Sequence, residues 1–293
     1  MGNYFGQHFL KNKEKLRKIV NALELKDGDV VVEIGPGHGE LTNEIVLKFK
    51  SLKIENFKII AIEKDKDLVD DLKNKIYNLG LDKNIEIINN DVLKILNSLI
   101  FNLKSNYKIV GNIPYYITGY LFRILGELEY EPELIVLLIQ KEVAERVCAG
   151  KGNMNPSHKI MWGMNLLAAS VQFWAEPKII GYVSRKDFKP APKVDSAIIK
   201  LTPVTSQLLS RLKCNKEDYY KFIKILFKQP RKTILNNLLG ARKQELVNRN
   251  QEIKINNKEE IIKKLNKVGI EPNARPQDLS IEQIIKLSVV DFN

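Results

Sequence analysis

The chain has 293 residues, of which 44% are hydrophobic and 28% charged, as in a globular protein with room for an α/β core and a smaller second domain. Two cysteines and three scattered histidines lack metal-ligand spacing, and the apolar run at 134–139 is too short to span a bilayer, so we expect a cytoplasmic protein without a metal site or membrane anchor. The formal net charge of +12 favours a polyanionic partner.

Strand and helix patterns alternate along the first two thirds of the chain. We expect strands at 29–34, 57–62, 84–89, 107–112, 134–140, 177–184 and 195–202, and helices at 12–23, 40–50, 66–79, 118–127, 142–149 and 159–172. Such alternation predicts a mostly parallel sheet wrapped by helices. The last two strands have no helix between them, so we expect them to form a hairpin that adds an antiparallel strand.

The C-terminal part has a different character. Strand patterns stop near residue 206, and helical patterns at 218–228, 232–239, 258–267 and 280–287 predict a small helical bundle. Residues 206–293 hold 18 Lys and Arg against 10 Asp and Glu, which is two thirds of the net positive charge. We therefore expect a catalytic domain at 1–205, a linker near 202–206, and a helical domain at 206–293 that docks a polyanion.

A glycine-rich loop follows the strand expected at 29–34. It reads Gly35-Pro36-Gly37-His38-Gly39, and glycines allow the backbone to approach a ligand closely. A dinucleotide fingerprint would place its third glycine at position 40, where Glu40 stands. The loop is therefore weak for NAD and suits S-adenosylmethionine better, since that cofactor has no pyrophosphate to rest on a helix N-terminus.

Acidic residues follow the next two strands. Glu63 could accept hydrogen bonds from both hydroxyls of a ribose, and Asp91 could accept one from the amine of the cofactor's adenine. The carboxyl ends of parallel strands lie on one edge of the sheet, which is where open α/β sheets bind ligands. Together with the glycine loop, these acids predict a nucleoside-binding site.

The turn Asn112-Ile113-Pro114-Tyr115 suggests the chemistry. The exocyclic nitrogen of adenine is a poor nucleophile because its lone pair is delocalised, so an enzyme that uses it must hold its hydrogens with acceptors. The side chain of Asn112 and the carbonyl of Ile113 could do so. Pro114 fixes the chain and has no competing N–H, while Tyr115 offers a face for base stacking, worth about 1–3 kcal/mol.

These motifs resemble the ribosomal RNA adenine dimethyltransferase family, specifically its bacterial small-subunit (16S) type. The resemblance runs nearly end to end and includes the segments 6–10, 35–39, 62–63, 89–91, 111–115, 140–146 and 183–197. It implies a Rossmann-like S-adenosylmethionine-dependent methyltransferase sheet with a small all-helical C-terminal domain. It also implies N6,N6-dimethylation of two adjacent adenosines in the 3′-terminal hairpin of small-subunit RNA, within a pre-30S particle and by a monomer.

The resemblance also assigns roles to residues. The implied cofactor contacts are His8, Leu10, Gly35, Glu63, Asp91 and Asn112, to which the glycine loop adds Gly37. Residues 112–115 would hold the target adenine, and Phe188 would stack on the other face of that base. Basic side chains near 11–18 and in the C-terminal domain would dock the RNA.

Three segments depart from the family pattern. His8 stands where the family usually has Asn, the loop at 150–158 replaces a more compact Pro-Gly-Ser stretch that faces RNA, and Pro230 replaces a common arginine. These changes predict an altered cofactor contact at residue 8, altered RNA contacts in the loop, and slightly weaker phosphate contact near residue 230.

Three other functions are considered. An erythromycin-resistance type of 23S RNA methylase shares the catalytic motifs, but residues 231–238 and 269–280 resemble the C-terminal domain of the small-subunit enzyme. A non-catalytic ribosome-assembly factor on the same scaffold is the second alternative, and the retained Glu63 and 112–115 turn argue against it. An NAD oxidoreductase is the third, which Glu40 disfavours.

Overall fold

The structure is a computed structural model that describes residues 7–103, 106–150, 163–204, 215–240 and 257–290. Its contacts divide the chain into two compact units, the first formed by residues 1–144 and 176–203 and the second by residues 145–175 and 204–293. The first unit thus ends near the boundary expected at 205, but residues 145–175 group with the C-terminal part. The functions assigned to the two domains remain predictions.

Some sequence predictions concern residues outside the described ranges. They are Gly6, residues 151–158 of the expected RNA-facing loop, residues 159–162 of an expected helix, and residues 205–206 of the expected linker.

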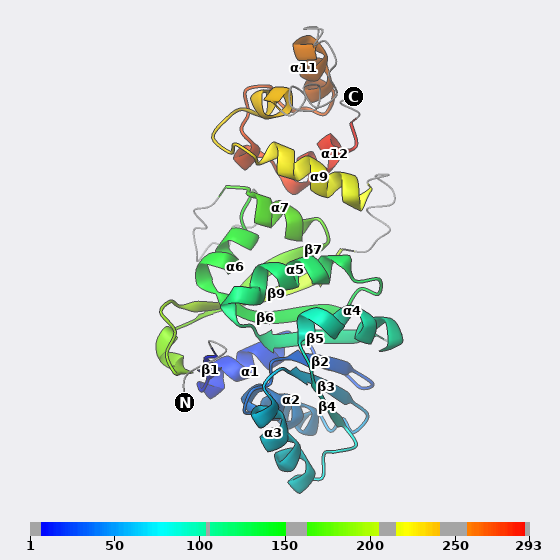
Figure 1. Ribbon diagram of the computed structural model, residues 1–293, viewed down its shortest axis with the longest axis vertical. Helices are drawn as coiled ribbons and strands as arrows, with labels where there is room; N and C mark the ends of the chain where they lie inside the picture. Colours follow the sequence, from blue (N-terminus) through cyan, green and yellow to red (C-terminus); the bar gives the residue numbers. More distant parts are fainter. Residues whose placement is uncertain (1–6, 104–105, 151–162, 205–214, 241–256, 291–293) are drawn as a thin grey trace. The chain divides into compact units, whose positions relative to one another are not determined.

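A seven-stranded mixed sheet forms the centre of the first unit (Figure 1). Its strands, in spatial order, are β4 (Ile85–Asn89), β3 (Lys58–Glu63), β2 (Val30–Ile34), β5 (Tyr107–Asn112), β6 (Leu134–Gln140), β9 (Ser196–Pro203) and β7 (Ala175–Val183). The strands from β4 to β6 are parallel, and β9 pairs antiparallel with β6. The predicted parallel sheet with an added antiparallel hairpin is therefore confirmed.

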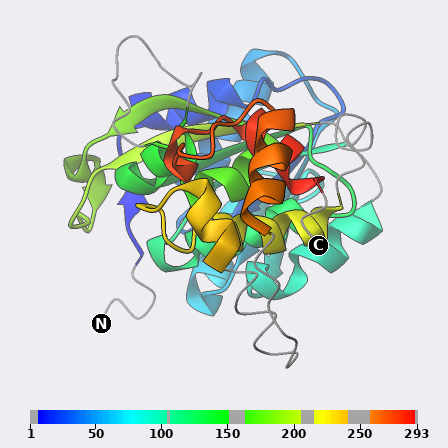
Figure 2. The same cartoon turned by 90° about the horizontal axis from the view of Figure 1, so that it is seen from above.

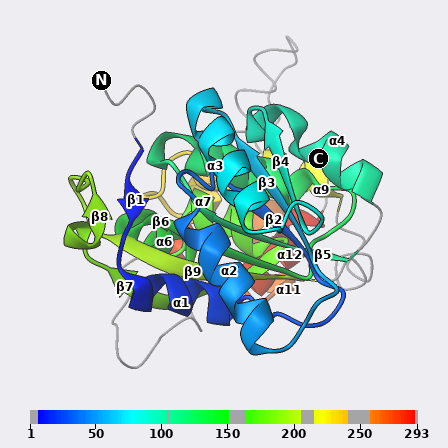
Figure 3. The ribbon, with the colours of Figure 1, turned by 90° about the horizontal axis from the view of Figure 1, so that it is seen from below.

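Helices cover both faces of this sheet. Helices α1 (Lys13–Ala22), α2 (Glu40–Ser51) and α3 (Lys66–Asn78) pack on one face, and α1 and α2 are visible in front of the strands in Figure 3. Helices α4 (Val92–Leu103) and α5 (Thr118–Glu127) pack against each other. Strands β2, β3 and β6 are mostly apolar because both faces of the sheet are buried at its centre. Helix α4 has no counterpart among the predicted elements.

A second, two-stranded sheet lies beside the first. Strand β1 (Phe9–Leu10) pairs antiparallel with β8 (Phe188–Lys189), and both strands are labelled in Figure 3. In the register of this pair, Leu10 is opposite Phe188. The short helix η2 (Arg185–Asp187) precedes β8, and the carbonyl of Asp187 accepts from the N–H of Lys11 at 2.8 Å. This pairing, which was not predicted, brings the N-terminal segment to a loop almost 180 residues away.

The second unit is helical, as predicted for the C-terminal part. It contains the last three residues of α6 (Lys141–Val147), together with α7 (Leu166–Gln172), α9 (Lys216–Leu226), residues 234–240, α11 (Asn257–Lys267), η3 (Pro276–Asp278) and α12 (Ile281–Ser288), coloured green to red in Figure 2. Its core includes Phe173 and Tyr219, whose rings stack at 4.0 Å. Helix α7 begins later than expected because Asn165 caps it by accepting from the N–H of Ala168.

Candidate active site

The site lies where the order of the strands reverses. From β2 the chain moves outward to β3 and β4 and then returns to β5 on the other side of β2, which leaves a crevice at the carboxyl ends of β2 and β5. A pocket at this point is lined by Gln7, His8, Phe9, Gly35, Gly37, Glu63, Asn112, Ile113, Pro114, Tyr115 and Phe188. Nine residues predicted for the site therefore lie around a single cavity.

The glycine loop is shaped for close backbone approach. Gly35 and Gly37 have φ values of +67° and +58°, which side-chain-bearing residues rarely adopt. A Cβ at Gly37 would also lie 2.6 Å from a ring carbon of Phe9. The loop therefore forms a cradle that requires glycine at position 37 for both its conformation and its surroundings.

Glu63 is held at the end of β3 by backbone donors. Its Oε2 accepts from the N–H of Gly37 at 3.1 Å, and its Oε1 accepts from the N–H groups of Lys64 and Asp65 at 2.9 and 3.0 Å. The residue is only 4% exposed, yet it lines the pocket. Since each carboxylate oxygen can accept more than one hydrogen bond, the fixed carboxylate suits the hydroxyls of a ribose.

Asp91 lies in an adjoining pocket that shares Gly35, Glu63 and Pro114 with the first. Its Oδ2 accepts from Nζ of Lys64 at 3.0 Å, and its Oδ1 accepts from the N–H of Leu93 at 3.0 Å. Partial burial favours the neutral form, but these hydrogen bonds outweigh it and hold the pKa of Asp91 below its ordinary value. The two joined pockets present acceptors that fit the ribose and the adenine amine of an S-adenosylmethionine-type cofactor.

The amide of Asn112 has a defined orientation. Its Nδ2 donates to the carbonyl of His8 at 2.7 Å. Because a carbonyl can only accept, the nitrogen of the amide must face His8, and Oδ1 is the atom that remains to accept from a ligand. This is the orientation that binding an adenine amine requires.

The rest of the 112–115 turn is anchored on the sheet. The N–H of Ile113 donates to the carbonyl of Leu138 at 3.0 Å, and the side chain of Ile113 is buried. Tyr115 begins the short helix η1 (Tyr115–Ile117), and its hydroxyl lies 2.8 Å from Oγ of the fully buried Ser196. Burial raises the pKa of the Tyr115 phenol, so its ring is a neutral stacking surface.

The remaining predicted residues differ in their placement. Phe188 is only 6% exposed but lines the same pocket as Tyr115. Leu10 is buried in the core and lines neither pocket, so its side chain supports the site through packing. Nδ1 of His8 lies 2.8 Å from the carbonyl of Pro190, which requires the tautomer with the proton on Nδ1.

Sequence reasoning missed several residues of the site. Phe9, Lys64 and Ser196 were not assigned a role, although each contacts a predicted residue or lines the pocket. Lys64 lies directly between Glu63 and Asp65, so its position beside the acidic residues was the only available signal. Ser196 gave none, because its contact depends on how β9 is placed beside β6.

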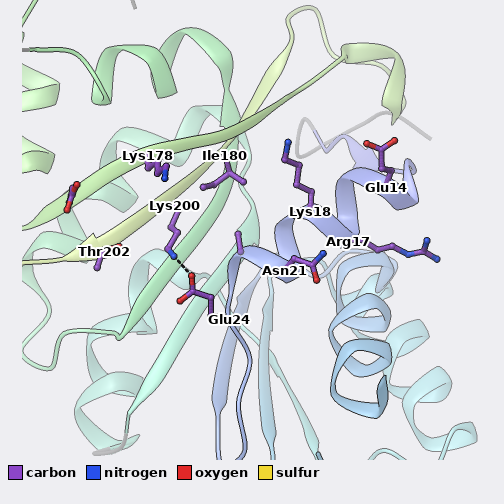
Figure 4. Close-up of a pocket in the computed structure, with 11 residues that line it drawn as sticks. Glu14, Arg17, Lys18, Asn21, Glu24, Lys178, Ile180, Lys200 and Thr202 are labelled. Atoms are coloured by element: carbon purple, nitrogen blue, oxygen red, sulfur yellow. Dashed lines mark hydrogen bonds and ion pairs between the residues drawn. The ribbon is translucent and has the colours of Figure 1, made fainter. Parts of the chain in front are cut away.

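An open groove lies elsewhere on the first unit, between α1 and the strands β7 and β9. Figure 4 shows Lys18 on α1 and Lys178 and Lys200 on the two strands, with Lys200 paired to Glu24 at 2.5 Å. The lining also includes Arg17, Asn21, Thr202, Glu14 and Glu176. The groove therefore contains both cationic and acidic side chains, and its lysines do not by themselves make it an anion-binding site.

Neither a membrane segment nor a metal cluster occurs within the described residues. No helix among them has the length and apolar character to cross a bilayer. No three His, Cys, Asp or Glu residues in the same ranges are arranged to hold a metal ion.

Comparison with known proteins agrees with the geometry. Residues 2–270 match the family described as ribosomal RNA adenine dimethylase. A "Ribosomal RNA small subunit methyltransferase A" of Mycoplasma capricolum is 36% identical over 97% of this chain and 95% of its own. A protein with the same name from Lactobacillus acidophilus is 35% identical over 97% and 88% of the two chains.

Solved structures share the fold over nearly the whole chain. A dimethyladenosine transferase from Plasmodium falciparum superposes with a TM-score of 0.72 at 28% identity, covering 96% of both chains. A 23S rRNA methyltransferase, ErmE, has a TM-score of 0.64 at 22% identity, covering 96% of this chain and 98% of its own, and shows likeness of fold alone. With the family model matched over most of its length, this chain belongs to the ribosomal RNA adenine dimethylase family.

Proposed function

We propose that this protein dimethylates N6 of two adjacent adenosines in the 3′-terminal hairpin of small-subunit ribosomal RNA, within a pre-30S particle. Membership of the family makes it an S-adenosylmethionine-dependent rRNA adenine dimethyltransferase, and the names of its relatives support the small subunit as the substrate. The observation that carries the proposal is the fixed amide of Asn112, whose Oδ1 is available to a base in the pocket.

The chemistry follows from what these residues can hold. Oδ1 of Asn112 and the carbonyl of Ile113 accept from the two amine hydrogens of adenine, which directs the nitrogen lone pair toward its methyl donor. Tyr115 and Phe188 border the base and supply stacking surface. When bound, S-adenosylmethionine supplies a methyl group on a positively charged sulfur. No strong general base is required, since the alkylated nitrogen loses its proton readily.

The cofactor would be held by residues at the carboxyl edge of the sheet. Glu63 would accept from the ribose hydroxyls and Asp91 from the adenine amine, while Gly35 and Gly37 let the backbone come close. Asn112 belongs to both parts of the site, because its amide joins the base pocket to the N-terminal segment. The carbonyl of His8 makes this link, so the link does not depend on which side chain stands at position 8.

RNA would dock through exposed cations on both units. Lys13, Arg17 and Lys18 are exposed on α1, and Lys18 borders the groove in Figure 4. In the second unit, Lys224, Lys228, Arg231 and Lys232 are exposed around the end of α9. Because such contacts release counterions, affinity for the RNA falls as the salt concentration rises.

The two alternatives are a 23S RNA methylase and a ribosome-assembly factor. The likeness to ErmE is one of fold and gives no support to a 23S substrate, whereas the relatives with 35–36% identity are named for the small subunit. A ribosome-assembly role can coexist with catalysis. A cytoplasmic location is part of the same proposal and is supported by the family's ribosomal RNA substrate. Action as a monomer is also part of the proposal.

The decisive experiment offers two substrates in parallel. Methyl transfer from labelled S-adenosylmethionine is measured on unmethylated small subunits and on unmethylated large-subunit RNA, and the labelled nucleoside is identified. Label in dimethyladenosine near the 3′ end of small-subunit RNA supports the proposal, and label only in large-subunit RNA contradicts it. Asn112→Ala is the control, since it should keep RNA binding and lose methyl transfer.

A further inference from the structure

Two exposed aromatic side chains lie where η1 leads into α5, just after the 112–115 turn. Tyr116 of η1 is 66% exposed and Tyr120 of α5 is 53% exposed, whereas Leu121 and Phe122 of α5 are buried. A solvent-facing helical stripe is normally polar, because an exposed ring gains little from folding. Their exposure gives the two tyrosines no role in the hydrophobic core.

Gly119 leaves an open space at the start of α5. Tyr116 lies in η1 and Tyr120 in the first turn of α5, and Gly119, the neighbour of Tyr120 in the chain, is exposed as well. A Cβ built at Gly119 would meet nothing within 4 Å. Glycine within a helix costs about 1 kcal/mol relative to alanine. Neither close packing nor a positive φ requires glycine at position 119. Its effect is to leave room beside Tyr120.

This face is continuous with the candidate active site. Tyr116 directly follows Tyr115 and lines the pocket that also contains Lys64 and Asp91. Lys64, which pairs with Asp91 at 3.0 Å, places a cation at the same edge, and Arg123, which pairs with Glu127 at 3.0 Å, is exposed one turn beyond Tyr120. Aromatic faces with nearby cations are the combination that binds unstacked bases and their phosphates.

We propose that Tyr116, Gly119 and Tyr120 form a stacking slot for the nucleotide adjacent to the target adenosine. This inference rests on the proposed function, because it takes RNA as the substrate. The target base enters at the 112–115 turn, so its neighbour on the strand comes within reach of the next residues of the chain. Stacking would hold the neighbouring base out of the RNA helix, which keeps the target extruded.

The test uses the full-length protein with unmethylated small subunits. For Tyr116→Ala, Tyr120→Ala and Gly119→Ala we expect KM and the dissociation constant for the particle to rise about fivefold or more. For Tyr120→Ala and Gly119→Ala, which line neither pocket of the candidate site, kcat should be nearly unchanged. Tyr116→Phe and Tyr120→Phe should restore binding, because the ring is kept. Tyr77→Ala is the matched control, since Tyr77 is 75% exposed on α3.

Gly119→Ala separates the slot from a structural role. With open space around it, the added methyl should keep or raise the midpoint of thermal unfolding, so weaker RNA binding could not come from misfolding. Unchanged particle binding in this variant, together with tyrosine variants that behave like Tyr77→Ala, would overturn the proposal. So would weaker S-adenosylhomocysteine binding by Tyr116→Ala without any change in particle binding.

Failure of the proposed function would look different. If the wild-type protein transferred no methyl group to small subunits, the activity would be wrong. The comparison of dissociation constants would still decide whether the slot binds RNA.

Discussion

The side-chain amide of Asn112 donates a hydrogen bond of 2.7 Å to the carbonyl of His8, although 104 residues separate the two. His8 belongs to the segment that β1 fixes against β8. The orientation of the Asn112 amide therefore depends on the N-terminal segment. This chain departs from the family pattern in the side chain at position 8, whereas the contact is made by the main chain of that residue.

Asn112→Asp should strongly reduce methyl transfer, although it replaces only the amide NH2 group by an oxygen. The carboxylate has no hydrogen to donate to His8, and two oxygens would face each other. We expect a rate at least about 100-fold lower and a loss of about 1–3 kcal/mol in the free energy of unfolding, measured by methyl-transfer assays and denaturant titration. Asn90→Asp is the stability control, because Oδ1 of Asn90 acts as an acceptor from the N–H of Asp91. Equal stability of both variants would contradict the assigned orientation.

Gly37→Ala should weaken cofactor binding, and it should do so more than a substitution that introduces the same backbone strain elsewhere. The added Cβ would lie 2.6 Å from the Phe9 ring, and the positive φ is unfavourable for alanine. Gly80→Ala is a matched control, since Gly80 has φ +63° with nothing within 4 Å. Calorimetry with S-adenosylhomocysteine should show a loss of at least about tenfold in affinity for Gly37→Ala alone. A similar affinity in both variants would mean that the cradle is not used.

The sequence predicted the sheet well because its strands are buried on both faces. Apolar runs bounded by polar turns marked β5 and β6 with the bounds that the structure shows. Helix α4 was missed, although Val92, Leu96 and Ile100 recur at helical spacing and are buried. Strands β1 and β8 have two residues each, which is too short for any periodicity to be recognised.

The sequence predicted which residues form the site but not which of them contact each other. The residues could be assigned to one site because they follow parallel strands, whose carboxyl ends lie on one edge of the sheet. The bond from Asn112 to His8 and the pairing of Lys64 with Asp91 depend on how distant segments approach each other. Residue spacing carries no information on such contacts.

The stability of the wild-type protein should fall between pH 4.5 and about 7 because of Glu33. Glu33 is fully buried, and burial raises its pKa from 4.5 to about 7. The hydroxyl of Thr42 donates to Oε2 of Glu33 at 2.7 Å, which lowers the pKa but does not offset the effect of burial. A raised carboxyl pKa means that the folded state binds the proton more tightly. The contribution of Glu33 is therefore complete below pH 4.5 and is lost as the pH rises through about 7.

Glu33→Gln provides the test, because glutamine resembles the protonated acid. The difference in unfolding free energy between wild type and Glu33→Gln should change by about 3 kcal/mol from pH 4 to pH 8, with wild type losing stability. Denaturant titrations across this range measure it. A difference independent of pH would show that folding does not raise the pKa of Glu33.

Lys108 and Asp29 form a buried ion pair whose disruption should be costly. Nζ of Lys108 lies 2.7 Å from Oδ2 of Asp29, their side chains are 4% and 5% exposed, and the ammonium also donates to the carbonyl of Glu24. Lys108→Met should cost about 3–5 kcal/mol of unfolding free energy, because it leaves a buried carboxylate without its cation. Lys26→Met, which breaks an exposed pair with Glu133, should cost less than about 1 kcal/mol.

The double variant Asp29→Asn/Lys108→Met should recover part of the loss, since no charge is then left unpaired. A double variant as unstable as the sum of its single variants would indicate that the two groups act independently, despite their contact.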